Sequence, residues 1–336
     1  MKIDVMLTAG WPSEAPARAE ALHHAGVDGI FTFENAHDVF LPLVTAATAR
    51  PDLDVDYMTN VAIAFPRSPL HVAYAANDLQ HLTSGRFRLG LGTQVKAHIE
   101  KRYGATWSRP AARMGEMVRA IRAIFDAWER TTERLDFRGE FTTHTLMTPA
   151  FDPGPNPFGP PPILVGALGP KMCEMAGAVA DGVLVMPFNS ERHFHERTLP
   201  ALARRNGDGF EIVPEVIVAM GRTADEQQAA ANGVKGLLSF YASTPSYRPV
   251  LDVEGRGELQ PELNALSKQG RWADMAQRID DDLLHTLAVV GTPEDCAVQI
   301  ATRFGDQADR VCCYFPGYPV TDERIGELVT ALHAAT

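Results

Sequence analysis

Residues 57–92 read YMTNVAIAFPRSPLHVAYAANDLQHLTSGRFRLGLG and contain one complete strand–helix–strand unit. The segments 57–64 and 87–92 are apolar runs with the length and composition of buried strands. Between them, Ser68 followed by Pro69 is typical of a helix start, with a capping hydroxyl and a proline in the first turn. Two buried strands joined by a helix predict a parallel pair, because parallel neighbours need a long crossover connection.

The same alternation continues on both sides of this unit. Further strand-like segments are centred near residues 3, 30, 164, 184, 215 and 312, with helical patterns between most of them. The total of eight strands is that of a closed (β/α)8 barrel. An open, doubly wound sheet is the alternative, but it usually has fewer strands and a glycine-rich first turn. The sequence therefore predicts an α/β fold, a (β/α)8 TIM barrel formed by residues 1–336 as a single domain.

Two segments interrupt the alternation and are predicted to be insertions. The first covers about residues 131–162; residues 135–147 alternate as a hairpin would, and a stretch rich in proline and glycine follows. The second covers about residues 242–271 and is predicted to be irregular, because it is also rich in proline and glycine. We expect both insertions to cover the mouth of the barrel and to influence substrate choice.

Composition excludes several classes of function. Of the 336 residues, 45% are hydrophobic, which is enough for a large core, and the net charge is −11. An acidic chain is a poor binder of nucleic acid or of anionic membranes. No apolar run approaches the ~20 residues that span a bilayer, and the first residues lack the apolar core of a signal peptide. The four cysteines show no CxxC spacing, so we expect reduced thiols and a cytoplasmic protein.

Barrel enzymes carry their chemistry at the carboxyl ends of the strands, and this rule selects residues near the second strand. His37 can exchange protons near neutral pH, and we expect it to act as a catalytic acid or base, oriented by Asp38 or Glu34. Simpler alternatives exist. His37 would then bond to backbone or cap the next helix, and Glu34 would pair with an arginine such as Arg67.

Two glycine-containing turns follow the fourth and fifth strands. Gly92, Thr93 and Gln94 form the first turn, and the second consists of Gly166, Ala167, Leu168 and Gly169. Glycine allows a ligand to approach the backbone, and a helix start offers unpaired N–H groups to an anion. Together the turns indicate a phosphate-bearing cofactor, although either alone is weak evidence and no GxGxxG or GxxxxGK[ST] motif is present.

A catalytic metal is not predicted. His23 and His24 are adjacent on one helix and cannot face a single ion, and His193 and His195 fall in a polar helix away from a strand end. A GxSxG motif is also missing, which argues against an acyl-transfer hydrolase.

Longer stretches carry a resemblance to a known family. They are AGVDGIFTFENAHDVFLPL (25–43), the segment from Asn60 to Gly104 that includes RSP and SGRFRLGLG, PPILVGALGPKMCEMAGAVADGVLV (161–185), FYASTPSYRPVL (240–251) and VVGTPEDCA (289–297). The chain resembles the luciferase-like monooxygenase superfamily. Within it, the ending GLGTQVKAHIEKRYG is similar to coenzyme F420-dependent oxidoreductases of the actinobacterial type.

This resemblance implies a (β/α)8 barrel with insertions and a cofactor site. It implies a cis peptide bond between Asn60 and Val61, so that Asn60, Val61 and Ala62 form a bulge behind the cofactor ring. It further implies that Thr93, Gln94 and His98 hold the cofactor chain or phosphate, with Gly92 beside them, and that residues 166–169 cradle its tail.

The resemblance also implies an activity. His37 aligns with a strand-2 histidine of sugar-phosphate dehydrogenases in this family, but Ala36 and Val95 stand where those enzymes have acids, which argues against sugar-phosphate oxidation. The implied reaction is hydride transfer between coenzyme F420 and a small organic substrate, in a homodimer. Alternatives are an FMN-dependent monooxygenase using reduced flavin and oxygen, a metal-dependent hydrolase, and a non-catalytic member that binds a flavin or lipid.

Overall fold

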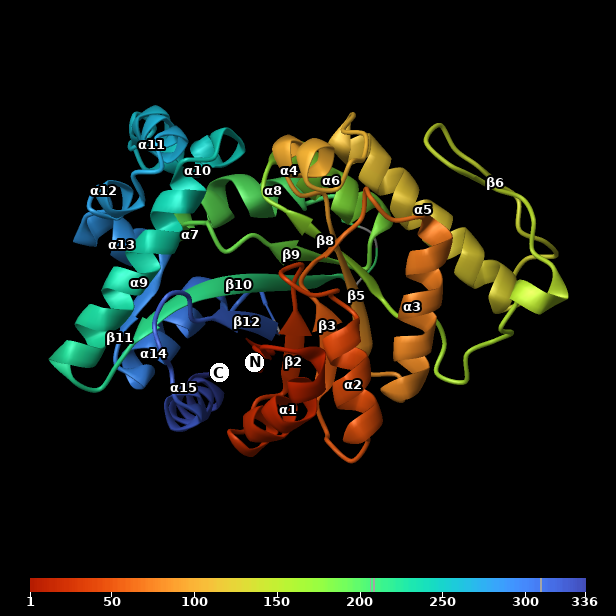
Figure 1. Cartoon of the computed structure of the whole chain (residues 1–336), viewed down its shortest axis with the longest axis horizontal. Helices are drawn as coiled ribbons and strands as arrows, with labels where there is room; N and C mark the ends of the chain where they lie inside the picture. The colour runs from red at the N-terminus through yellow and green to blue at the C-terminus, as the bar shows by residue number, and fades with distance from the viewer. Residues whose placement is uncertain (206, 208, 309) are drawn as a thin grey trace.

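Eight parallel strands close into a barrel in the order β1–β2–β3–β5–β8–β9–β10–β12, and β12 returns to β1. The computed structural model describes residues 1–205, 207, 209–308 and 310–336, and Figure 1 shows helices surrounding the strands. This confirms the predicted (β/α)8 fold. The barrel strands are β1 (Lys2–Met6), β2 (Gly29–Thr32), β3 (Asp56–Thr59), β5 (Phe87–Gly92), β8 (Ile163–Ala167), β9 (Gly182–Val185), β10 (Glu211–Met220) and β12 (Arg310–Tyr314).

Strand β10 is the longest strand and joins three neighbours in turn. Its first residues pair with β9, its middle with β12, and its last residues, 218–220, with the short strand β11 (Val289–Gly291). The sequence pattern did not predict β11. A second short strand, β4 (Ala62–Ile63), continues the path of β3 and pairs with β5.

The barrel interior is built in layers, because alternate residues of each strand point inward. The amino-terminal layer is ionic: Arg310 pairs with Asp4 and Asp56, and Arg88 pairs with Asp56 and Glu211. The middle layer is apolar and consists of Phe31, Met58, Leu164, Leu184, Val213 and Cys312. These two layers fill the amino-terminal and middle parts of the barrel. A site can therefore form only at the carboxyl ends of the strands.

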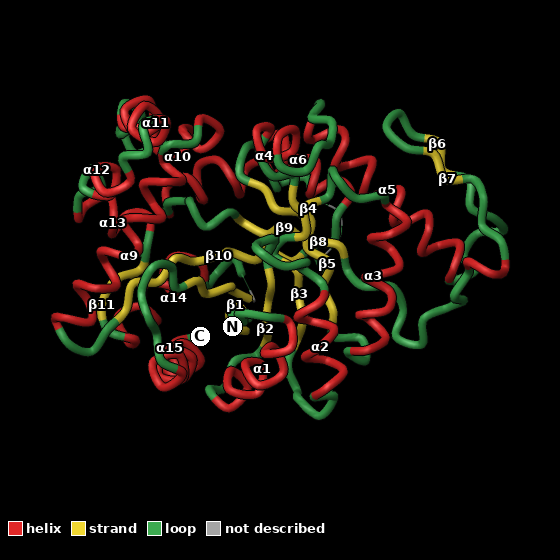
Figure 2. Tube along the Cα trace, in the orientation of Figure 1, coloured by secondary structure: helices red, strands yellow, loops and turns green. Residues whose placement is uncertain are grey.

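Helices cover the outside of the barrel in the expected alternation (Figure 2). Ser68 caps α3 by accepting from the Leu70 N–H, as the sequence predicted. Within the described residues, no helix combines the length and apolar character needed to cross a membrane. The outer helices are α1 (Ala15–His24), α2 (Leu41–Ala49), α3 (Pro69–Leu82), α4 (Lys96–Lys101), α5 (Pro110–Trp128), α6 (Pro170–Val179), α7 (Glu191–His193), the π-helical turn η3 (Phe194–Thr198), α8 (Leu199–Ala201), α9 (Ala224–Ala242), α14 (Pro293–Phe304) and α15 (Asp322–Ala335).

The first insertion forms the predicted hairpin, β6 (Phe137–Arg138) with β7 (Thr143–His144). The buried Glu116 of α5 holds its tip by accepting from the N–H groups of Glu140, Phe141 and Thr142 at 2.6–2.7 Å. These bonds place the hairpin along the outer side of α5 (Figure 1). The expectation that this insertion covers the barrel mouth was therefore wrong, because its polar contacts are to outer helices.

The second insertion is helical, so the prediction of an irregular segment was also wrong. Its elements are η4 (Pro245–Tyr247), α10 (Arg248–Val253) and α11 (Leu259–Lys268), followed by α12 (Trp272–Ala276) and α13 (Asp281–Leu287). Its prolines start helices instead of breaking them, since Pro245 and Pro249 lie in first turns. Gly255 adopts a φ of 71° just after α10. Of these helices, α11, α12 and α13 pack against α9, beside β10 and β11 (Figure 1).

Candidate active site

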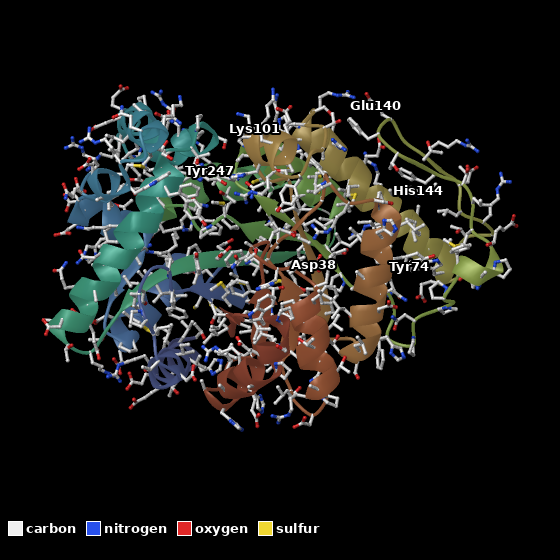
Figure 3. The ribbon with its side chains drawn as sticks, in the orientation of Figure 1. Asp38, Tyr74, Lys101, Glu140, His144 and Tyr247 are labelled. Atoms are coloured by element: carbon white, nitrogen blue, oxygen red, sulfur yellow. The ribbon has the colours of Figure 1, made fainter. Side chains whose placement is uncertain are left out.

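The predicted site residues follow four consecutive strands of the barrel, β2, β3, β5 and β8. Because parallel strands end at one rim, the fold brings these residues to the same mouth. Asp38 lies over the strand ends near the centre of the molecule, and Tyr247 lies toward α9 and α10 (Figure 3). A pocket of about 230 Å³ opens beside the ends of β1 and β2, and Met6, Gly10, Phe33 and His37 are among its lining residues.

His37 lies on the wall of this pocket and bonds to backbone. Its Nε2 is 2.6 Å from the carbonyl oxygen of Gly10, and its ring centroid is 4.8 Å from that of Trp11. A carbonyl only accepts hydrogen bonds, so Nε2 carries the proton in this contact. Nδ1 is then the atom through which the neutral ring can take up a second proton.

The two carboxylates expected to orient His37 instead bind Arg67. Glu34 accepts two hydrogen bonds from the Arg67 guanidinium, at 2.7 and 2.9 Å, and one from the Ile63 N–H at 3.1 Å. Asp38 lies 3.2 Å from Arg67 and accepts from the Phe40 N–H at 2.9 Å. The simpler interpretation of Glu34 as the partner of Arg67 is thus the observed one. The carbonyl of Gly10, and not an acid, fixes the imidazole.

Val61 forms a bulge that packs against β5 and β8. The Asn60–Val61 peptide bond is cis, as the resemblance implied. A Cβ atom on Gly92 would lie 2.3 Å from Val61 Cγ2, and one on Gly166 would lie 3.3 Å from Val61 Cγ1. Gly92 is therefore required for the bulge to fit against β5, Gly166 packs closely against it, and Ala62 behind it is fully buried.

The turn after β5 uses its polar groups locally. Thr93 Oγ1 donates to the Gln94 carbonyl at 3.0 Å, and Gln94, at a φ of 57°, accepts from the Val95 N–H at 2.9 Å. His98 lies in α4 and is partly exposed; burial, with nearby Arg102, lowers the pKa of its imidazole. A ligand that binds Thr93 or Gln94 would have to replace the hydrogen bonds that these side chains make within the turn. The His98 imidazole could bind a ligand without breaking such a bond.

The turn after β8 leads into α6 and is open. Gly169 is the N-cap of α6 and has no side chain to satisfy the first N–H groups, and a Cβ atom there would meet nothing within 4 Å. Ala167 is buried and Leu168 is partly exposed. Pro170 has no N–H, and the N–H groups of Met172 and Cys173 donate to the Gly169 carbonyl, so Gly169 and Lys171 supply the N–H groups that this helix start can present to a phosphate or carboxylate group.

Glu215 was missed by the sequence analysis. It lies on β10, two residues after Val213 of the apolar middle layer. Its side chain therefore points into the barrel one layer above, toward the mouth. Asn60 Nδ2 donates to Glu215 Oε2 at 3.3 Å from the opposite side of the barrel. Burial raises the pKa of its carboxyl to about 8, and the bond from Asn60 offsets only part of this effect. In the sequence, Glu215 is the single acid within the apolar run IVPEVIVAM (212–220), and this is the signal that could have identified it.

Metal chemistry has no preformed site in the part of the chain that the structure describes, where no group of three or more His, Cys, Asp or Glu residues could hold an ion. All four cysteines are buried. Burial raises the pKa of the Cys173 and Cys313 thiols to about 12, so neither is a nucleophile near neutral pH.

Comparisons with known proteins agree with this architecture. The family model described as luciferase-like monooxygenase matches residues 1–310. The chain is 44% identical over 309 residues to an uncharacterized protein of Mycobacterium tuberculosis, covering 90% of each chain. It is 29% identical over 327 residues to another M. tuberculosis protein, provisionally named a coenzyme F420-dependent oxidoreductase, covering 90% of this chain and 91% of the relative.

A solved structure extends the similarity to the whole fold. The coenzyme F420 dependent tetrahydromethanopterin reductase from Methanopyrus kandleri matches with a TM-score of 0.79 and 17% identity, covering 99% of this chain and 98% of the other. At that identity the match concerns the fold alone. With the family model matching nearly the entire barrel, the chain belongs to the luciferase-like monooxygenase family.

Proposed function

We propose that this protein is a coenzyme F420-dependent oxidoreductase that transfers hydride between the deazaflavin and a small organic substrate. The observation that carries the proposal is the joint presence, at one mouth, of the partly exposed Val61 bulge and the open start of α6. The similarity to a relative provisionally named as F420-dependent supports the choice of cofactor.

The residues present fit an anionic, ring-containing cofactor. At the Asn60–Ala62 bulge, Val61 presents a partly exposed apolar side chain between Gly92 and Gly166, suitable for the face of a flat ring. The open turn at Gly169 can present the N–H groups of Gly169 and Lys171 to an anionic tail. We assign ring contact to Val61, on the bulge that Asn60 and the buried Ala62 form with it, and tail contact to Gly92, Thr93, Gln94, His98 and residues 166–169. Coenzyme F420, when bound, supplies a two-electron carrier that accepts or donates hydride.

The chain itself would manage the proton that accompanies hydride transfer. His37 is held by the Gly10 carbonyl at 2.6 Å, which leaves Nδ1 to take up or release a proton. Arg67 neutralises Glu34 and Asp38, so that these acids shape the pocket wall without facing the substrate as free carboxylates. Their proposed part in catalysis is therefore to position the loop that carries His37.

The second candidate is an FMN-dependent monooxygenase, and the description of the matching family favours it. The two functions differ in whether oxygen is consumed. Purified protein would be supplied with a panel of small alcohols, aldehydes, amines and imines, once with coenzyme F420 under nitrogen and once with FMN, a flavin reductase and oxygen. Substrate-dependent change in deazaflavin absorbance supports our proposal. Substrate-dependent oxygen uptake, with no deazaflavin turnover, would replace it by the monooxygenase.

A further inference from the structure

Glu215 occupies an unusual place in the barrel. It lies in the layer directly above the apolar middle layer of the barrel, yet the residue is only partly buried. The partly exposed Tyr241, Tyr247 and Tyr314 lie near enough that the charge of Glu215 raises the pKa of each phenol. Glu215 is the register partner of Cys312, and Tyr314 follows two residues later on the same face of β12, so the carboxyl and the Tyr314 ring lie on the β10 and β12 side of the mouth.

Aromatic rings gather on this side of the mouth. The Phe188 ring centroid lies 6.0 Å from that of Tyr241 and 6.1 Å from that of Tyr247, and those two tyrosines are 5.9 Å apart. Tyr314 lies 6.1 Å from Phe33, which also lines the pocket beside His37. Three structural elements, α9, η4 and β12, thus bring tyrosine rings to the same carboxyl.

The carboxyl has no cationic partner. Burial and the amide of Asn60 are the influences on its ionisation, and no lysine or arginine among the described residues contributes. The other interior acids, Asp4, Asp56 and Glu211, are paired with arginines in the ionic layer below. An isolated carboxyl costs free energy when it ionises in such a place, and a bound cation would offset that cost.

We propose that Glu215 and the rings of Tyr241, Tyr247 and Tyr314 form a binding site for a small organic ammonium group. Rings offer their negative faces to a cation, and the carboxylate supplies the opposite charge. Calling this cation the substrate, an amine next to the carbon that exchanges hydride, rests on the proposed function; the binding site itself does not.

Binding should release a proton. Near neutral pH the carboxyl is mainly protonated, since burial raises its pKa to about 8, and it must ionise to pair with an ammonium ion. The groups that face it are the amide of Asn60, the phenols of Tyr241, Tyr247 and Tyr314, and the thiol of Cys312. Burial raises the pKa of those phenols and of that thiol, so Glu215 is the group among them that titrates near neutrality.

The test is isothermal titration calorimetry of the full chain at pH 7 with benzylammonium, benzyl alcohol and benzoate. We expect benzylammonium to bind about tenfold tighter than benzyl alcohol, benzoate to bind more weakly than either, and the heat of ammonium binding to depend on the buffer in the sense of proton release. Glu215→Gln should abolish both the preference and the proton release. Tyr247→Leu should weaken ammonium binding, Tyr247→Phe should retain it, and Tyr74→Leu, on the outer face of α3 (Figure 3), should change nothing.

Equal affinities for ammonium and alcohol, no measurable ammonium binding, or a preference that survives Glu215→Gln would overturn the inference. Thermal unfolding of each variant checks that it folds, and Tyr247→Phe keeps the test informative if Glu215→Gln is damaged. The same titrations are repeated with coenzyme F420 present. Coenzyme binding without ammonium preference contradicts this inference alone, and ammonium preference without coenzyme binding contradicts the proposed function alone.

Discussion

Asn60 and Glu215 meet across the barrel from opposite strands, with Asn60 Nδ2 3.3 Å from Glu215 Oε2. Asn60 is also the first residue of the cis peptide at the Val61 bulge. One side chain therefore joins the proposed cofactor side of the mouth to the side lined by tyrosines. The hydrogen bond also gives a buried acid its only side-chain partner among the influences on its ionisation.

The stability of the protein should depend on pH through Glu215. Its pKa is about 8 in the folded chain and near the ordinary 4.5 when unfolded, so the folded chain binds the proton more tightly. The stability that this provides is complete below pH 4.5 and is lost as pH rises through 8. Relative to wild type, Glu215→Gln should therefore gain at least about 1.4 kcal/mol between pH 5 and pH 8.5, the equivalent of one pKa unit. Urea unfolding at the two pH values measures this, and a pH-independent difference would contradict it.

The pairing of Arg67 with Glu34 should be essential for folding stability. The two side chains are 19% and 10% exposed, so removing the guanidinium leaves a largely buried carboxylate unpaired. We expect Arg67→Met to lower the free energy of unfolding by about 3 kcal/mol, and Glu34→Gln in the same chain to restore part of that loss. Arg192→Met, at the exposed ion pair with Glu196 on the same helical segment, is the control and should cost less than about 1 kcal/mol. Similar losses for Arg67→Met and Arg192→Met would refute the assignment.

Substitutions at the glycines of the mouth should distinguish a position needed for folding from a position needed for coenzyme binding. Gly92→Ala places a Cβ atom 2.3 Å from Val61 and should destabilise the fold by about 1–3 kcal/mol. Gly169→Val enters open space and should leave stability unchanged while weakening coenzyme F420 binding. Gly236→Ala, on the exposed face of α9, is the control that should affect neither binding nor folding adversely. Coenzyme titration and thermal unfolding of each variant measure the two effects, and normal coenzyme affinity in Gly169→Val would remove the α6 start from the site.

His37 should act on turnover and not on coenzyme binding. With a substrate identified from the panel, His37→Gln should lower kcat by about a hundredfold or more, because glutamine cannot exchange a proton. The dissociation constant of coenzyme F420 should change little, since the ring is held by Gly10 on the pocket wall. Steady-state kinetics and coenzyme titration distinguish the two, and unchanged kcat would assign His37 a purely structural contact with backbone.

The fold was predictable because local signals agreed along the chain. The unit at residues 57–92 shows why: apolar runs mark β3 and β5, and Ser68 with Pro69 marks the start of α3. The prediction of an irregular second insertion was wrong for a related reason. Proline and glycine indicate both loops and helix starts, and only tertiary packing decides that Pro245 and Pro249 begin helices.

The strand-end positions of the candidate site residues were predictable, but their hydrogen-bond partners were not. Strand ends selected His37, Asn60 and Gly169, because that rule depends on topology alone. The sequence could not show that Arg67 binds both Glu34 and Asp38, nor that Gly10 holds His37, since each contact joins different strand ends. Glu215 was missed because its importance depends on the barrel closing β10 against β12 opposite β3.

The most direct test of the central claim is titration of the purified protein with coenzyme F420 and, separately, with FMN, followed by tryptophan fluorescence. Trp11 is an exposed reporter 4.8 Å from His37 at the pocket, and Trp11→Phe identifies its share of the signal. Our account predicts saturable quenching by coenzyme F420 at micromolar concentration or below, with much weaker binding of FMN. A preference for FMN would contradict it in favour of the monooxygenase, and binding of neither would contradict both.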